Sequence, residues 1–167
     1  MRRRCIAAPL LLQFCTLACA PLNNERARNN ETTNFQSEET ALRKAAEKAQ
    51  ATLDDFLAKA KQQPAGTSGY AMQVKVEDGR AIEYFWVEEF TWSDGSFTAR
   101  IDSEPQRVKS VKPGQVYRFS RSQVADWKYL DEKKGKTMGA FTACALLSTE
   151  APARAEEIKL RDGLDCS

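Results

Sequence analysis

The chain of 167 residues contains no histidine. This absence excludes serine–histidine and cysteine–histidine nucleophilic pairs, the commonest general base, and most zinc sites. The sequence also has no glycine-rich phosphate loop and no dinucleotide-binding fingerprint. We therefore expect a protein that is not an enzyme and that carries no cofactor and no metal ion.

Carboxylates are the catalytic groups that the missing histidines leave available. Glu88 and Glu89 are neighbours in the chain, so they would point to opposite faces of a strand. Glu88 could instead converge in space with Asp126. This acid pair keeps an alternative function open, a carboxylate-dependent hydrolase that acts on an envelope carbohydrate or peptide.

The chain also lacks an apolar run of about 20 residues, the length that spans a bilayer. Three arginines at positions 2–4 precede a shorter apolar stretch over residues 6–18, a pattern typical of a cleaved signal peptide. Residues 16–19, TLAC, resemble the lipobox of bacterial lipoproteins. We therefore expect residues 1–19 to be a signal peptide with a lipobox, and Cys19 to be lipidated. Ordinary cleavage after Ala20 is the alternative.

These features predict an exported, periplasmic protein that a lipid on Cys19 anchors to a membrane. Ala20 stands where an aspartate commonly retains a lipoprotein in the inner membrane, which favours the outer membrane. Residues 1–19 hold three of the 25 basic residues and none of the 23 acidic ones, so the remainder has a net charge of −1. A chain with this charge is not expected to bind nucleic acid.

The chain has five cysteines, and two of them are available to form a disulfide in the mature protein. Two of the five lie inside the signal peptide and one is Cys19, which leaves Cys144 and Cys166 in an oxidising compartment. We predict a disulfide between them. A buried Cys144 with a free Cys166 is the alternative. A metal site is disfavoured because the two thiols are far apart in the sequence and no histidine joins them.

The N-terminal part after the signal peptide changes character at residue 38. Residues 20–37 are polar and lack apolar periodicity, which predicts a flexible tether. Over residues 38–61, leucine, alanine and phenylalanine recur at three- and four-residue steps. This pattern predicts an amphipathic helix that covers one face of a sheet.

The sheet is built around the densest apolar and aromatic run, residues 81–92. Turn-forming Asp-Gly dipeptides lie before and after this run, and such dipeptides close tight hairpins. We therefore expect a three-stranded antiparallel meander of residues 70–77, 81–92 and 96–102, with the middle strand in a central position.

The remaining residues predict further short elements. Proline and glycine predict a type II turn over residues 112–115, and Ser120 can cap a single helical turn that follows. Residues 138–147 fit a short strand or a mixed segment, and residues 151–164 fit a short helix. The fold class is α+β, with an N-terminal amphipathic helix packed on an antiparallel, strongly bent β-sheet, and one domain over residues 38–167.

Aromatic side chains are the best candidates for a binding surface. Trp86 and Trp127 are expected in the core, where large rings are usually found. Trp92 lies beside a turn, and we expect it to be partly exposed. The sequence therefore predicts a protein-binding face of Trp92, Asp94 and Phe97.

Three pieces of the sequence are distinctive: YFWV at residues 84–87, residues 114–127 with their final Asp-Trp, and FTA at residues 141–143. They resemble the YegJ-like bacterial proteins grouped as domain of unknown function 2314, over residues 40–166. That family has no established activity, so the resemblance implies the domain and no reaction. We expect a non-enzymatic protein-binding module of the envelope, such as an immunity or escort protein, with an unknown protein as its partner.

Overall fold

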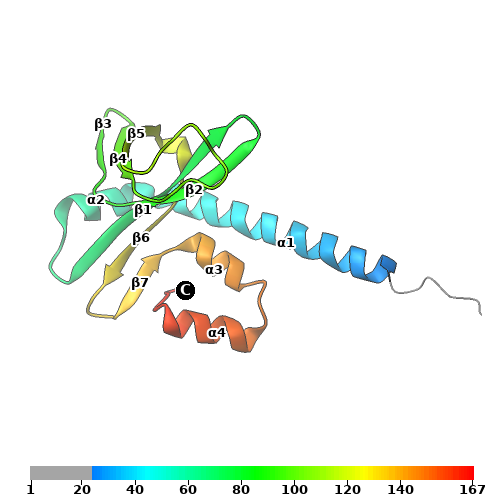
Figure 1. The fold of residues 1–167 in the computed structure, drawn as a ribbon. Helices are drawn as coiled ribbons and strands as arrows, with labels where there is room; N and C mark the ends of the chain where they lie inside the picture. Colours follow the sequence, from blue (N-terminus) through cyan, green and yellow to red (C-terminus); the bar gives the residue numbers. More distant parts are fainter. Residues whose placement is uncertain (1–23) are drawn as a thin grey trace, which may run out of the picture.

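The computed structural model describes the backbone of residues 24–167 and the side chains of residues 36–167. The predicted signal peptide and the predicted lipidation of Cys19 lie outside the described residues. The described chain begins and ends with helices and has strands between them (Figure 1). In chain order the elements are α1 (Asn24–Ala51), α2 (Leu53–Gln62), β1 (Thr67–Asp78), β2 (Ala81–Val87), β3 (Thr91–Ser93), β4 (Ser96–Ile101), β5 (Gln115–Ser120), the 3-10 turn η1 (Arg121–Gln123), β6 (Val124–Asp131), β7 (Lys136–Gly139), α3 (Phe141–Leu147) and α4 (Pro152–Arg161).

The strands form two antiparallel sheets, which confirms the α+β class. Sheet A has the order β2-β1-β6-β7, and sheet B has the order β3-β4-β5. Sheet A is strongly curled, and the register between β1 and β6 shifts twice along its length, as it does at β-bulges that bend a strand. Figure 1 shows sheet B at the β2 end of sheet A, and helices α3 and α4 at its β7 end.

The predicted meander is wrong, because residues 81–92 are not one strand. β2 ends at Val87, and Glu89 then adopts a left-handed backbone conformation with φ of 48°. The chain continues into sheet B, where Trp92 pairs with Phe97. β2 is therefore an edge strand of sheet A, and β1 lies between β2 and β6.

One hydrophobic core joins the two sheets and α2. Phe56 of α2 is 1% exposed and stacks on Trp127 of β6, with 4.9 Å between the ring centroids. The indole N–H of Trp127 donates to the backbone oxygen of Ala49 at 3.1 Å. Trp127 is thus a core residue as expected, whereas Trp86 is only half-buried, with the Lys128 ammonium 4.6 Å from its ring centroid.

The helix predicted over residues 38–61 is two helices, and it starts earlier than expected. α1 begins at Asn24, within the stretch predicted as a tether, and ends before Thr52. The buried residues Ala45 and Ala49 anchor its C-terminal half. Once a packed helical turn exists, each further residue adds one hydrogen bond without a new nucleation cost. This explains how a polar stretch without an apolar face continues the helix.

Several local predictions are confirmed in the second half of the chain. Gly114 has φ of 76°, and the Gln115 N–H donates to the Lys112 oxygen at 3.1 Å, as in a type II turn. Ser120 starts the η1 turn through a capping box with Gln123. The ambiguous residues 138–147 are indeed mixed, since β7 ends at Gly139 and α3 follows.

The C-terminal tail is joined to the sheet and to α3. The predicted disulfide between Cys144 and Cys166 is present, with 5.5 Å between the two Cα atoms. The Thr137 N–H of β7 donates to the Gly163 oxygen at 2.8 Å, and the Asp165 N–H donates to the Thr137 oxygen at 2.9 Å. The tail therefore lies along the outer edge of β7.

Among the described helices, none combines the length and the apolar composition that a bilayer crossing requires.

Candidate binding site

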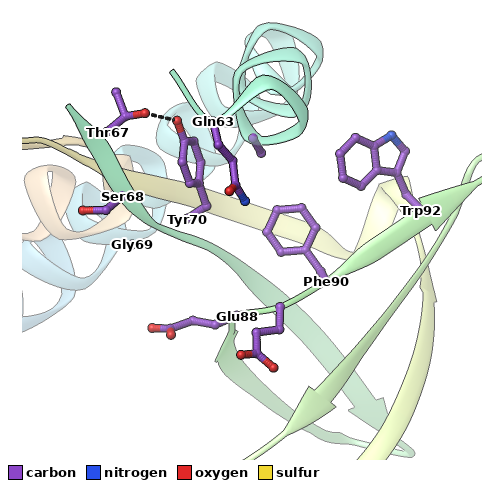
Figure 2. A pocket seen from close by; sticks show the side chains of 10 residues that line it. Gln63, Thr67, Ser68, Gly69, Tyr70, Glu88, Phe90 and Trp92 are labelled. Atoms are coloured by element: carbon purple, nitrogen blue, oxygen red, sulfur yellow. Dashed lines mark hydrogen bonds between the residues drawn. The ribbon is translucent and has the colours of Figure 1, made fainter. Parts of the chain in front are cut away.

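The candidate site is a hollow of about 340 Å³ beside the link between the two sheets. Three segments form it: the C-terminal end of α2, the beginning of β1, and the link from β2 into β3, including Trp92 of β3 (Figure 2). Trp92 and Glu88, which the sequence analysis assigned to two rival functions, both line this hollow. Its full lining is Ala60, Gln63, Thr67, Ser68, Gly69, Tyr70, Glu88, Glu89, Phe90 and Trp92.

Aromatic rings form one wall of the hollow and continue into the core. Phe90 packs between Phe56 and Trp92, with 5.8 Å between ring centroids on each side. Phe56 is buried, while Phe90 and Trp92 are half-buried. The exposed parts of these two rings are therefore held in place by a chain of ring contacts that begins in the core.

Tyr70 completes the aromatic wall and is fixed at both ends. Its ring stacks on Tyr129 with 5.4 Å between the centroids. Its hydroxyl donates to Thr67 Oγ1 at 2.6 Å (Figure 2), and the Thr67 hydroxyl donates to the Pro64 oxygen at 2.6 Å. The sequence analysis did not select Tyr70 or Phe90 for the site. The sequence offers one indication for Phe90: Glu88 and Glu89 interrupt the apolar run just before it, which is where the strand ends.

The two glutamates at the link lie together, which corrects the prediction that they point to opposite faces of a strand. The left-handed conformation of Glu89 ends the strand pattern, and both exposed side chains line the same hollow. For a residue other than glycine this conformation costs roughly 1–2 kcal/mol, which the surrounding packing must offset. Strained positions of this kind cluster at functional sites.

A second, more polar hollow of about 340 Å³ shares Glu88 and Glu89 with the first. Arg100 and Asp102 line it together with Glu88 and Glu89. Lys61, in the last turn of α2, lines a third hollow of about 280 Å³ with Phe90 and Trp92. Within the described residues, neither Glu88 nor Glu89 has a basic side chain within ion-pair distance.

The predicted binding face of Trp92, Asp94 and Phe97 is only partly formed. Asp94 is exposed in the turn between β3 and β4, with φ of 51°. Phe97 is 2% exposed and stacks on Phe119 with 5.4 Å between the centroids. Phe97 is therefore a core residue and offers no side-chain surface to a partner.

Asp126 is a buried structural carboxylate and does not join Glu88. It is 0% exposed, and both of its oxygens accept hydrogen bonds. Oδ1 accepts from the N–H groups of Trp127 at 2.8 Å and Phe141 at 3.2 Å. Oδ2 accepts from the N–H of Thr142 at 2.7 Å and its hydroxyl at 2.6 Å. Burial raises the pKa of the Asp126 carboxyl, although these hydrogen bonds oppose the shift.

The acid pair predicted from the sequence consequently has no geometric support. Glu88 lines the first and second hollows, and Asp126 lines neither of them. The carboxylate of Asp126 is occupied in holding the first turn of α3. The described residues also contain no group of three or more histidine, cysteine, aspartate or glutamate side chains arranged to hold a metal ion.

The fold is a small α+β domain with two antiparallel sheets, a disulfide-pinned tail and an aromatic hollow at the link between the sheets. This chain belongs to the family described as "Uncharacterized protein conserved in bacteria" (DUF2314), whose pattern matches residues 39–166. It is 27% identical over 121 residues to "Uncharacterized protein YegJ" of Escherichia coli (strain K12), which covers 72% of this chain and 76% of that protein. No solved structure matches the chain. The family resemblance drawn from the sequence is thus confirmed.

Proposed function

We propose that this chain is an exported, lipid-anchored protein of the cell envelope that binds another protein and catalyses no reaction itself. The basic and apolar pattern before Cys19 supports export and lipidation. The pair Cys144 and Cys166 supports an oxidising compartment, because disulfides persist there and are rare in the cytosol.

The observation that carries the binding role is the half-buried pair Phe90 and Trp92 beside two exposed glutamates. Aromatic residues with one face packed and one face free are enriched at protein interfaces. The rings are positioned by the core and not by a flexible loop alone, so the surface they offer is largely preformed. A preformed surface binds with a lower cost of ordering side chains.

The binding role is tested by affinity capture with three baits: the full chain and its two single variants Trp92→Ala and Tyr84→Ala. Tyr84 is the matched control, because it is 51% exposed and lines a different hollow with α1 residues. We expect one stoichiometric protein from native envelope and secreted fractions to be retained by the wild type and by Tyr84→Ala, and lost with Trp92→Ala. Circular dichroism establishes that both variants are folded.

The identity of the captured protein then separates the two roles that fit the proposal. A secreted toxin whose effect on growth is suppressed by this chain indicates an immunity protein, and an envelope component indicates an escort protein. Equal capture by all three proteins would remove the hollow from the proposal. Capture of nothing, together with turnover of an envelope substrate that Glu88→Gln abolishes, would replace binding by hydrolysis.

The anchor is tested separately on the mature protein. We expect mass spectrometry to find a diacylglycerol-modified Cys19 as the first residue, and we expect a Cys19→Ser variant to leave the membrane fraction. A mature chain that starts at Pro21 would contradict lipidation.

A further inference from the structure

The chemistry of the hollow indicates which part of a partner it receives. We propose that the hollow lined by Tyr70, Phe90, Trp92, Glu88 and Glu89 takes an arginine side chain of the partner protein. This inference rests on the proposed function, since it names the group that a protein partner would insert.

The aromatic wall is suited to a cation, and no cation of the described residues lies over Phe90 or Trp92. Elsewhere in the molecule, lysine ammonium groups lie over aromatic rings: Lys48 over Phe141 at 4.9 Å, Lys59 over Tyr129 at 5.3 Å, and Lys128 over Trp86 at 4.6 Å from the ring centroid. Among the described side chains, no lysine or arginine is placed in this way over Phe90 or Trp92. The exposed parts of these two half-buried rings are therefore available to a cation from outside.

The carboxylates add a negative charge, and no described basic side chain forms an ion pair with them. Glu88 and Glu89 line the hollow, and no basic residue lines it with them. Arg100 lines the second hollow with the two glutamates and does not line this one. The field in the hollow thus favours a positively charged group, and a neutral or acidic group would gain nothing from it.

The shape and the donor geometry favour arginine over lysine. A guanidinium group is planar, so it stacks on an aromatic face while its N–H groups reach carboxylates in the same plane. A lysine ammonium is a compact point charge that keeps its water more strongly. The volume of about 340 Å³ lies at the small end of ligand pockets, which span about 300–1,000 Å³, so it suits one side chain better than a whole cofactor.

The experiment uses protein purified from cells that express the full chain and follows the indole N–H signals of its 3 tryptophans by NMR. The Trp92 signal is assigned with a Trp92→Phe variant. The probes are a blocked glycyl-arginyl-glycine peptide, the same peptide with citrulline, which is neutral and nearly isosteric, and the same peptide with lysine. We expect the arginine peptide to shift the Trp92 signal in a saturable way, with affinity about fivefold or more above citrulline and above lysine.

Two double variants with the same change in charge test the carboxylates. Glu88→Gln with Glu89→Gln is expected to lower the affinity for the arginine peptide about fivefold or more. Glu156→Gln with Glu157→Gln, both on the exposed surface of α4, is the control and is expected to change it less than about twofold. Both pairs are exposed, so neither change threatens the fold.

The outcomes separate this inference from the proposed function. Equal binding of the arginine and citrulline peptides, or equal affinities of the two double variants, would overturn the arginine site. If the arginine peptide fails to bind while capture of a partner still depends on Trp92, the protein-binding function stands and the arginine site is wrong. If peptide binding and partner capture both fail, both proposals are wrong.

Discussion

The carboxylate of Asp126 accepts two hydrogen bonds from Thr142, one from its backbone N–H at 2.7 Å and one from its hydroxyl at 2.6 Å. This relationship links the buried strand β6 to the first turn of α3. The backbone N–H groups at the start of a helix have no hydrogen-bond acceptors inside the helix. Here a carboxylate from the core is their acceptor. Asp126 therefore holds the start of α3 against the buried strand β6.

Two variants that remove different parts of this contact should lower the stability of the protein by different amounts. We expect Thr142→Val to lower the free energy of unfolding by about 1–3 kcal/mol, since one hydrogen bond to a carboxylate is lost. Asp126→Ala should cost roughly 3 kcal/mol or more, because several N–H groups lose their acceptor. Urea denaturation measures both, with Asp102→Ala as an exposed control near zero. Equal stability of Asp126→Ala and the wild type would contradict the structural role.

A pH dependence is expected from Glu83 on the edge strand β2. Its carboxylate accepts hydrogen bonds from the backbone N–H groups of Gln106, Arg107 and Val108, at 2.9, 2.9 and 3.1 Å. These bonds hold the pKa of Glu83 below its usual value. A carboxyl with a lowered folded-state pKa stabilises the protein above its unfolded-state pKa, and this stabilisation is lost as the pH falls through the folded-state pKa.

Thermal denaturation of Glu83→Gln across pH tests this sign. We expect a lower melting temperature than the wild type at pH about 7, and a difference that shrinks as the pH falls below about 4 and through the lowered folded-state pKa of Glu83, below which both side chains are neutral. Glu132→Gln, at an exposed position in the loop between β6 and β7, is the control. A gap between Glu83→Gln and the wild type that stays constant over this range would refute the assignment.

The disulfide between Cys144 and Cys166 closes a sequence separation of 22 residues. By loop entropy such a link is worth about 3 kcal/mol. We expect the Cys144→Ser, Cys166→Ser double variant to lose that amount in chemical denaturation, and the wild type to lose the same amount under reducing conditions. The double variant itself should not respond to the reductant. Labelling of both cysteines by an alkylating agent in the denatured, non-reduced protein would show that the bond is absent.

The positive charge of Lys61 should weaken the binding of an arginine side chain in the hollow. This lysine lines the neighbouring hollow with Phe90 and Trp92, so its charge opposes an incoming cation. We expect Lys61→Gln to raise the affinity for the arginine peptide about twofold at low salt, and to have no effect at about 1 M salt, where screening is strong. Lys44→Gln on α1 is the matched control. An unchanged affinity of Lys61→Gln at low salt would show that the charge of Lys61 does not act on the site.

Elements with strong local signals were predictable from the sequence. Glycine at position 114 and Ser120 mark backbone conformations that few other residues favour, and both turns form as expected. The separation into two sheets was not predictable, because it depends on Glu89. A glutamate gives no signal for a left-handed conformation, which is usually marked by glycine or asparagine.

The candidate site was predictable only in part. Trp92 and Glu88 were selected for separate reasons, and the structure places them in one hollow because the strand breaks between them. Phe97 alternates with polar residues on either side, but only the packing of sheet B on the core shows that its face is buried. The role of Asp126 depends on a helix that begins 15 residues later in the chain, a contact that no local pattern contains.

The C-terminal tail protects the protein from aggregation through its strand edge. An uncovered strand edge offers a row of unpaired backbone groups to any other chain, and proteins avoid aggregation by covering such edges. Here the residues around Leu164 lie against β7 and occupy that edge, and the bond to Cys144 keeps them there. The disulfide therefore helps to keep the protein soluble, because a reduced molecule can release the tail more easily and expose the edge of β7 to pairing with other chains.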